Sequence, residues 1–210
     1  MQPSGRTLNV GGLSLDSKTA VLIISAVLLL TIQRYHRLTP WFPLDMVIWC
    51  FIVPLAIILV IWRERPSAYG LRLGNWRRGL LFTLGSLVLM TPILWIVART
   101  PDFRSYYGNS TPTWNWLILN SVPNLFSWEF FFRGFLLFGL AQRYGDDAIL
   151  LQAIPFAIAH LGKPELETLS TIFGGAAFGY IARRTDSMLY PFLIHGFVQV
   201  LTIALASGMI

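Results

Sequence analysis

The sequence predicts an all-α, polytopic transmembrane helical bundle. Of its 210 residues 55% are hydrophobic and only 12% are charged, and its mean hydropathy is +0.60. An ordinary soluble domain carries about twice that share of charged residues, which excludes a water-soluble globule. No Pro/Gly/Ser-rich stretch is long enough to link two separately folded units. We therefore expect a polar N-terminal segment over residues 1–18 and a single integral membrane domain over 19–210.

Seven apolar stretches are candidate membrane spans. A helix rises 1.5 Å per residue and the hydrocarbon core is about 30 Å thick, so a span needs roughly 17 to 25 mostly apolar residues. The stretches cover residues 19–33, 45–62, 79–98, 113–142, 146–161, 166–182 and 187–208. Because a proline can break a helix, Pro123 could divide the fourth stretch. The prediction is about seven spans, with eight possible.

The basic residues predict how the chain lies in the membrane. With seven spans, ten Lys and Arg side chains fall on the side of the N-terminus and five on the other side; the five are Arg34, Arg37, Arg99, Arg104 and Lys163. Cytoplasmic loops carry the excess of these residues, so we expect a cytoplasmic N-terminus in a bacterial-type inner membrane. The cations form no continuous basic face, so nucleic acid is not an expected partner. The sequence does not indicate an oligomeric state.

The ionisable side chains Glu129, Arg133, His160 and His195 lie within the predicted spans. A charge at the bilayer centre costs at least roughly 2.5 to 3.5 kcal/mol, so such groups need partners or a water-filled cavity. Glu129 and Arg133 are four residues apart and share one helix face, which predicts a charge-assisted pair. Counted at 1.5 Å per residue from the cytoplasmic ends, Glu129, His160 and His195 lie at depths of about 20, 21 and 12 Å. These groups are therefore expected to meet in one cavity, although a purely structural ion pair and interhelical hydrogen bonds remain the alternative.

The order of three short motifs resembles a known protease family. They are Glu129-x3-Arg133-Gly134, Phe156-x3-His160 and His195-x3-Gln199. This order, over about residues 123–199, resembles the CPBP intramembrane proteases, also called the Abi or CAAX protease family. The catalytic-type core would occupy about residues 113–208.

The resemblance implies an intramembrane endopeptidase in which a glutamate activates water and two histidines assist. Applied to this chain, it assigns water activation to Glu129, positioning of the water to His160, and oxyanion stabilisation to His195 with Gln199. Arg133 would hold Glu129 ionised. The implied partners are a peptide or protein substrate, possibly membrane-anchored, and membrane lipid.

The sequence departs from the family pattern at Trp128. Relatives usually have two consecutive glutamates before x3-Arg, and the first is taken as the base. Here Trp128 stands at that position, and Glu129 points about 100° away from it on a helix. Glu167 is a second candidate base, because it follows His160 by about two helical turns. The alternative for Glu167 is an acid favoured by the start of a helix.

Two further alternatives stay open at the level of sequence. We expect no cofactor, but zinc is possible, and Glu129, His160 and His195 would then form the three-ligand set of a catalytic zinc site. The chain could also be a non-catalytic membrane binding, scaffold or immunity protein that has lost the first glutamate. The single cysteine, Cys50, lies within an apolar run and is expected to serve packing.

Overall fold

The computed structural model describes residues 7–109 and 112–210. The chain begins with an antiparallel hairpin of β1 (Thr7–Val10) and β2 (Leu13–Asp16), in which Thr7 faces Asp16. This hairpin is the exception to the predicted all-α composition. It lies in the polar segment predicted over residues 1–18, of which the first six residues lie outside the described part.

Helices make up most of the remaining described chain. The first is α1 (Ser17–Tyr35), and the second is a joined helix of α2 (Phe42–Val47), η1 (Ile48–Ile52), α3 (Val53–Ala56) and η2 (Ile57–Trp62). The short η3 (Pro66–Tyr69), α4 (Trp76–Val97) and α5 (Pro101–Tyr107) follow, and then a long joined helix of α6 (Trp114–Glu129), η4 (Phe130–Phe138) and α7 (Gly139–Tyr144). The chain continues through the short η5 (Gly145–Asp147), α8 (Ala148–Ile158), α9 (Glu165–Thr185) and α10 (Leu189–Ala206). The segments η1, η2 and η4 are π-helical. Each of the seven predicted stretches therefore corresponds to a helix or to a run of joined helical segments.

The helix starts follow ordinary capping chemistry. The Asp16 carboxylate accepts a hydrogen bond from the Thr19 amide at 2.8 Å and so caps α1, and the Asn75 side chain caps α4 in the same way. The long helix continues through Pro123, although a proline has no amide to donate to the carbonyl four residues earlier. The Ser127 hydroxyl donates to the Pro123 carbonyl at 2.7 Å. The break at Pro123 that would have given an eighth span is absent from the described helix.

Four of the described helices are long and apolar enough to cross a membrane: α1, the helix over Phe42–Trp62, α4 and α10. α8 has 11 residues, which at 1.5 Å per residue reaches only about half of a bilayer core. α9 is long enough, but it carries acids in its first turn and arginines in its last turn. The membrane-helical architecture is as predicted, while the count of seven spans stays a prediction.

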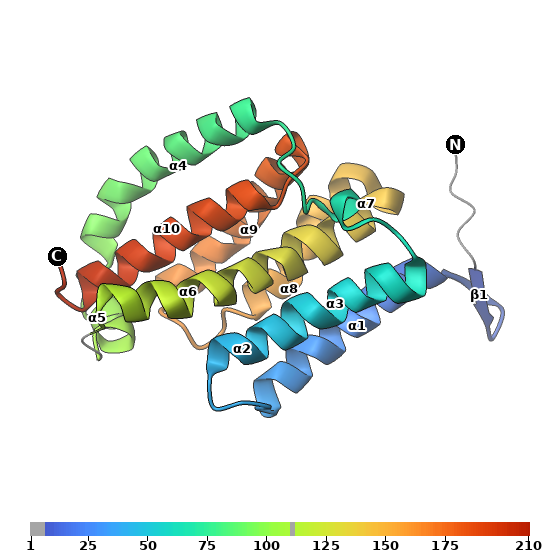
Figure 1. Ribbon diagram of the computed structural model, residues 1–210, viewed down its shortest axis with the longest axis horizontal. Coiled ribbons are helices and arrows are strands. Elements are labelled where there is room, and N and C mark those ends of the chain that lie inside the picture. The colour runs from blue at the N-terminus through green and yellow to red at the C-terminus, as the bar shows by residue number, and fades with distance from the viewer. Residues whose placement is uncertain (1–6, 110–111) are drawn as a thin grey trace.

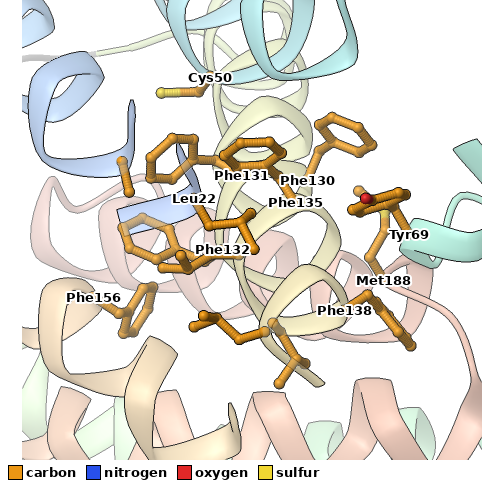
Figure 2. Packing of buried hydrophobic residues seen from close by; sticks show 14 of the residues in the cluster. Leu22, Cys50, Tyr69, Phe130, Phe131, Phe132, Phe135, Phe138, Phe156 and Met188 are labelled. Atoms are coloured by element: carbon orange, nitrogen blue, oxygen red, sulfur yellow. The ribbon is translucent and has the colours of Figure 1, made fainter. Parts of the chain in front are cut away.

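The long helix α6–η4–α7 packs against helices from both halves of the chain (Figure 1). All nine residues of η4 are buried, and their rings pack edge-on or stacked on neighbouring helices. The ring centroids of Phe130 and Phe51 are 4.8 Å apart, and those of Phe135 and Trp62 are 5.6 Å apart. The ring centroid of Phe132 is 5.2 Å from that of Phe156. Figure 2 shows this cluster around η4, with Cys50 buried in it as predicted.

The two ends of the bundle differ in their polar contacts. The end near the N-terminal hairpin, here called the N-terminal end, has four ion pairs between separate segments: Lys18–Glu64, Asp16–Arg143, Arg72–Asp186 and Asp146–Arg183. The opposite end holds the loop 36–41, the short helix α5 and the turn 159–164, and there Lys163 pairs with Glu167. In Figure 1 the hairpin strand β1 and the C-terminus lie at opposite ends.

Candidate functional site

The Glu129–Arg133 pair predicted from the spacing is present. Both side chains are fully buried at the junction of α6 and η4, and Nη1 of Arg133 donates to Oε1 of Glu129 at 3.1 Å. Two opposite charges that are buried together compensate each other, whereas either alone would be costly. The pair therefore fixes one charged carboxylate in the interior of the bundle.

His195 joins this pair from α10. Its Nδ1 lies 2.7 Å from the same Oε1 of Glu129. Because an ionised carboxylate only accepts hydrogen bonds, Nδ1 carries the proton and donates it, which leaves Nε2 of His195 free to accept. The carboxylate of Glu129 thus sets both the tautomer and the orientation of the imidazole.

Aromatic rings and one backbone carbonyl contact the Arg133 guanidinium. The guanidinium carbon lies 3.9 Å from the ring centre of Phe156 and 5.2 Å from that of Phe178. Nη2 of Arg133 approaches the Gly175 carbonyl at 3.5 Å, and Nε2 of Gln152 donates to the same carbonyl at 2.8 Å. Gln152 was not among the residues predicted for the site. The available signal was an amide within the apolar stretch 146–161, and the structure buries it fully.

His160 lies just beyond α8 and is also oriented by a hydrogen bond. Its Nδ1 is 2.7 Å from the Phe156 carbonyl, which can only accept, so Nε2 of His160 is the free ring nitrogen. The ring packs 4.5 Å from Phe156 and 6.2 Å from Trp128. The Phe156-x3-His160 spacing therefore places the carbonyl and the ring of Phe156 against the imidazole.

A pocket of about 840 Å³ connects these groups, and we call it the main pocket. His160, His195 and Gln199 line it, and so does Trp128, whereas Glu129 does not. The side-chain amide of Gln199 donates to the Ser121 hydroxyl at 3.3 Å, a contact that the sequence did not predict. Trp128 thus occupies part of the wall where relatives carry their first glutamate.

Asn120 and Asn124 precede Trp128 by eight and four residues on the same helix, and their side chains have different surroundings. Asn124 lines the main pocket. Asn120, four residues before it, instead accepts a hydrogen bond from the indole of Trp41 at 3.0 Å. Of these two asparagines, only Asn124 lines the main pocket.

Glu167 does not line the main pocket. Its carboxylate accepts hydrogen bonds from the Tyr107 hydroxyl at 2.7 Å and from the Lys163 ammonium at 2.7 Å. Burial and the neighbouring Glu167 carboxylate raise the pKa of Tyr107 well above its usual value, so this phenol stays a neutral donor. These two hydrogen bonds hold the Glu167 carboxylate on Tyr107 and Lys163, outside the lining of the main pocket.

The zinc set considered from the sequence is not assembled. Among residues 7–109 and 112–210, no group of three or more His, Cys, Asp and Glu side chains is placed to hold a metal ion. Glu129, the third member of that set, contacts His195 and Arg133 and does not line the main pocket with the two histidines. The described residues therefore do not bring these three ligands to one point.

Comparison with known proteins relates part of the chain to a protease family. The family model described as "Type II CAAX prenyl endopeptidase Rce1-like" matches residues 109–201. No curated protein and no solved structure matches the chain. The matched range contains all three motifs. Over residues 109–201 the chain is therefore similar to the type II CAAX prenyl endopeptidases, which supports the predicted CPBP, or CAAX protease, family.

Proposed function

We propose that this protein is an intramembrane endopeptidase of the CPBP type, which hydrolyses a peptide bond near the membrane with an activated water and two histidines. The observation that carries the proposal is the hydrogen bond between Glu129 and His195. It places a buried carboxylate behind an imidazole that lines the main pocket. The substrate would be a peptide or a protein, membrane-anchored or lipid-embedded. The enzyme would lie in a bacterial-type inner membrane with its N-terminus in the cytoplasm.

In this proposal His195 is the general base. Its free Nε2 accepts a proton from water, while Glu129 holds the Nδ1 proton and stabilises the imidazolium that forms. Arg133 compensates the charge of Glu129 when His195 is neutral. Glu129 thereby acts through His195 and not directly on water, which fits its absence from the pocket wall. This arrangement supplies a base although Trp128 replaces the first glutamate of the family pattern.

His160 and Gln199 would complete the site. The free Nε2 of His160 can accept a hydrogen bond from the water and hold it in position. The amide of Gln199 can leave Ser121 and donate to the oxyanion that develops on the substrate carbonyl. A direct role for Glu167 in water activation would require it to leave Lys163 and Tyr107.

Cleavage assays on site variants test the proposal. Comparative proteomics of cells with and without the protein would first identify a precursor whose mass changes, and purified protein would then be assayed on it. His195→Ala and His160→Ala should each lower kcat/KM by at least about a hundredfold. Glu129→Gln should lower kcat with little change in KM, because Glu129 does not contact the pocket. Glu165→Gln, which changes an exposed acid of α9, is the matched control and should be as active as wild type.

The outcomes separate the enzyme from the alternative. Unchanged cleavage in the Glu129, His160 and His195 variants would eliminate the proposed mechanism. Preserved biological function in variants that cleave nothing would favour a non-catalytic binding or immunity protein. Activity that depends on bound zinc in metal analysis, and is lost on chelation, would overturn the metal-free mechanism.

A further inference from the structure

Three cationic side chains line the main pocket together with the candidate catalytic groups. They are Arg34, Arg37 and Lys163. Among the described residues that line this pocket there is no aspartate or glutamate. The pocket therefore combines a wall of one sign of charge with apolar side chains.

Each cation reaches the pocket from a different part of the fold. Arg34 lies in the last turn of α1, and Arg37 follows in the loop 36–41, where its guanidinium lies 4.7 Å from the Phe42 ring centre. Lys163 lies in the turn between α8 and α9. All three belong to the end of the bundle opposite the N-terminal hairpin, so the charge is concentrated at one end of the site.

The two arginines carry most of the uncompensated charge. Lys163 is already paired with Glu167 at 2.7 Å. Within the described residues no ion pair engages Arg34 or Arg37, and both side chains are exposed. A cleft with one sign of charge and low-dielectric walls focuses its field and attracts ligands of opposite sign.

The chemistry of the arginines indicates which ligand fits. A guanidinium presents a planar fork of donors that matches a carboxylate in two parallel hydrogen bonds. The pocket volume of about 840 Å³ lies within the range of about 300 to 1,000 Å³ that is typical of ligand sites. It leaves room for several residues of an extended peptide beside His160 and His195.

We propose that the main pocket selects peptide segments that carry a carboxylate, either an acidic side chain or a free C-terminus, and that Arg34 and Arg37 bind this group. This inference rests on the proposed function, since it assigns the substrate class of the same site. The cations determine specificity, while the groups around His195 carry out the chemistry.

Binding and cleavage of matched peptide pools by the full-length protein test the inference. The protein is reconstituted in phosphatidylcholine, and the probes are dye-labelled decapeptide pools that contain one acidic residue or its amide counterpart, each with a free or an amidated C-terminus. Acidic or free-carboxylate pools should bind about tenfold more tightly than neutral pools at low salt, and less so at high salt. Comparison of the pools shows whether the side chain or the chain terminus supplies the carboxylate.

Charge-matched variants assign the effect to the pocket. Arg34→Gln combined with Arg37→Gln should abolish the preference for acidic over neutral peptides. Arg77→Gln combined with Arg78→Gln removes the same charge from exposed positions at the start of α4 and should retain the preference. Equal binding of acidic and neutral pools by wild type would overturn the inference, as would a preference that the Arg34 and Arg37 changes do not alter.

Two further readouts keep this inference separate from the proposed function. If acidic peptides bind selectively but no pool is cleaved, the substrate class stands and the enzyme assignment fails. If neutral pools are cleaved as fast as acidic ones, the enzyme stands and the inference fails. Binding of short-chain phosphatidylglycerol that depends on Arg34 and Arg37, without selective peptide binding, would assign the pocket to lipid headgroups and also contradict the inference.

Discussion

Glu64 connects several segments at the N-terminal end of the bundle. Its carboxylate accepts hydrogen bonds from the Lys18 ammonium at 2.6 and 2.7 Å, from the Tyr69 hydroxyl at 2.7 Å and from the Gln142 amide at 3.5 Å. Burial alone would raise the pKa of Glu64, but the hydrogen bonds from Lys18 and Tyr69 more than offset it, so the pKa is lowered from its ordinary value. One side chain thus holds the first helix, the loop after Trp62 and the long helix together.

This lowered pKa predicts how stability depends on pH. A carboxyl group whose pKa is lower in the folded state stabilises the fold above its unfolded pKa, about 4.3, and the contribution disappears as the pH falls through the folded pKa. Glu64→Gln should therefore lower the Tm at pH 7 by the equivalent of less than about 1 kcal/mol, because the pair is partly exposed. The difference in Tm from wild type should vanish in the acid range, as measured by thermal unfolding in detergent. A difference that persists unchanged below pH 3 would contradict this assignment.

Single residues also show how far the site could be predicted from the sequence. The spacing of four was enough to pair Glu129 with Arg133, because helix geometry fixes that contact locally. The partner of His195 lies 66 positions away, and no local pattern specifies such a contact. The 100° between Trp128 and Glu129 on a helix agrees with their placement, since Trp128 lines the main pocket and Glu129 does not. The candidate Glu167 is held by Lys163, four residues before it, and by Tyr107, whose approach depends on the tertiary fold.

At the scale of elements, α8 and α9 pack closely beside the charged pair. A Cβ added at Gly175 would lie 2.9 Å from Cδ1 of Phe156 and 3.3 Å from Cβ of Ala153. Phe156 in turn supports the Arg133 guanidinium and the His160 ring. The absence of a side chain at Gly175 therefore lets these two helices approach near the site.

Gly175→Ala should consequently destabilise the protein by about 1 to 3 kcal/mol through overpacking, and should reduce cleavage as Phe156 is displaced. Gly174→Ala is the matched control on the same helix, because an added Cβ there meets nothing within 4 Å. That change should be neutral or stabilising by up to about 1 kcal/mol, since alanine is the better helix former. Thermal unfolding of the two variants side by side measures the contrast. Equal stability of the two would show that the α8–α9 contact tolerates the extra methyl group.

The elements were predictable where hydrophobicity alone decides, and less so where local chemistry does. The predicted stretch 113–142 corresponds to the long helix over 114–144, and 187–208 corresponds to α10. The π-helical segments depend on how rings such as those of η4 pack, which single-residue patterns do not encode. The N-terminal hairpin was not predicted, because each strand has only four residues and so too few positions to show an alternating pattern. The long apolar stretch that follows gives a much stronger signal, and that signal is for a helix.

At the scale of the whole molecule, the path of the chain predicts which loops share a membrane face. Cysteines introduced at Ser67, Ser105, Asp147 and Glu165 occupy exposed positions, and Cys50 is fully buried and should stay unlabelled. With a cytoplasmic N-terminus, an impermeant maleimide added to intact cells should label Ser105→Cys and Glu165→Cys only. Ser67→Cys and Asp147→Cys should be labelled after the membrane is permeabilised.

The labelling pattern tests orientation and span count separately. Labelling of Ser67→Cys and Asp147→Cys in intact cells, in place of Ser105→Cys and Glu165→Cys, would indicate the opposite orientation with the same number of spans. Labelling of Asp147→Cys and Glu165→Cys from the same side would instead show that α8 does not cross the membrane. The short length of α8 makes this position the most informative one for the count of seven.

The unequal distribution of ion pairs has a consequence for how a chain could reach the buried histidines. Four inter-segment pairs fasten the helices around the N-terminal hairpin, and the Met188 amide also donates to the Gly70 carbonyl there at 3.0 Å. Because these contacts restrain the helices at one end, we expect thermal fluctuations to separate them at the other end. The fluctuations would widen the main pocket between α1 and α8, beside Arg34 and Lys163. Amide hydrogen exchange would then be fastest in the residues next to this opening. A polypeptide could enter laterally from the lipid while the helical bundle stays folded.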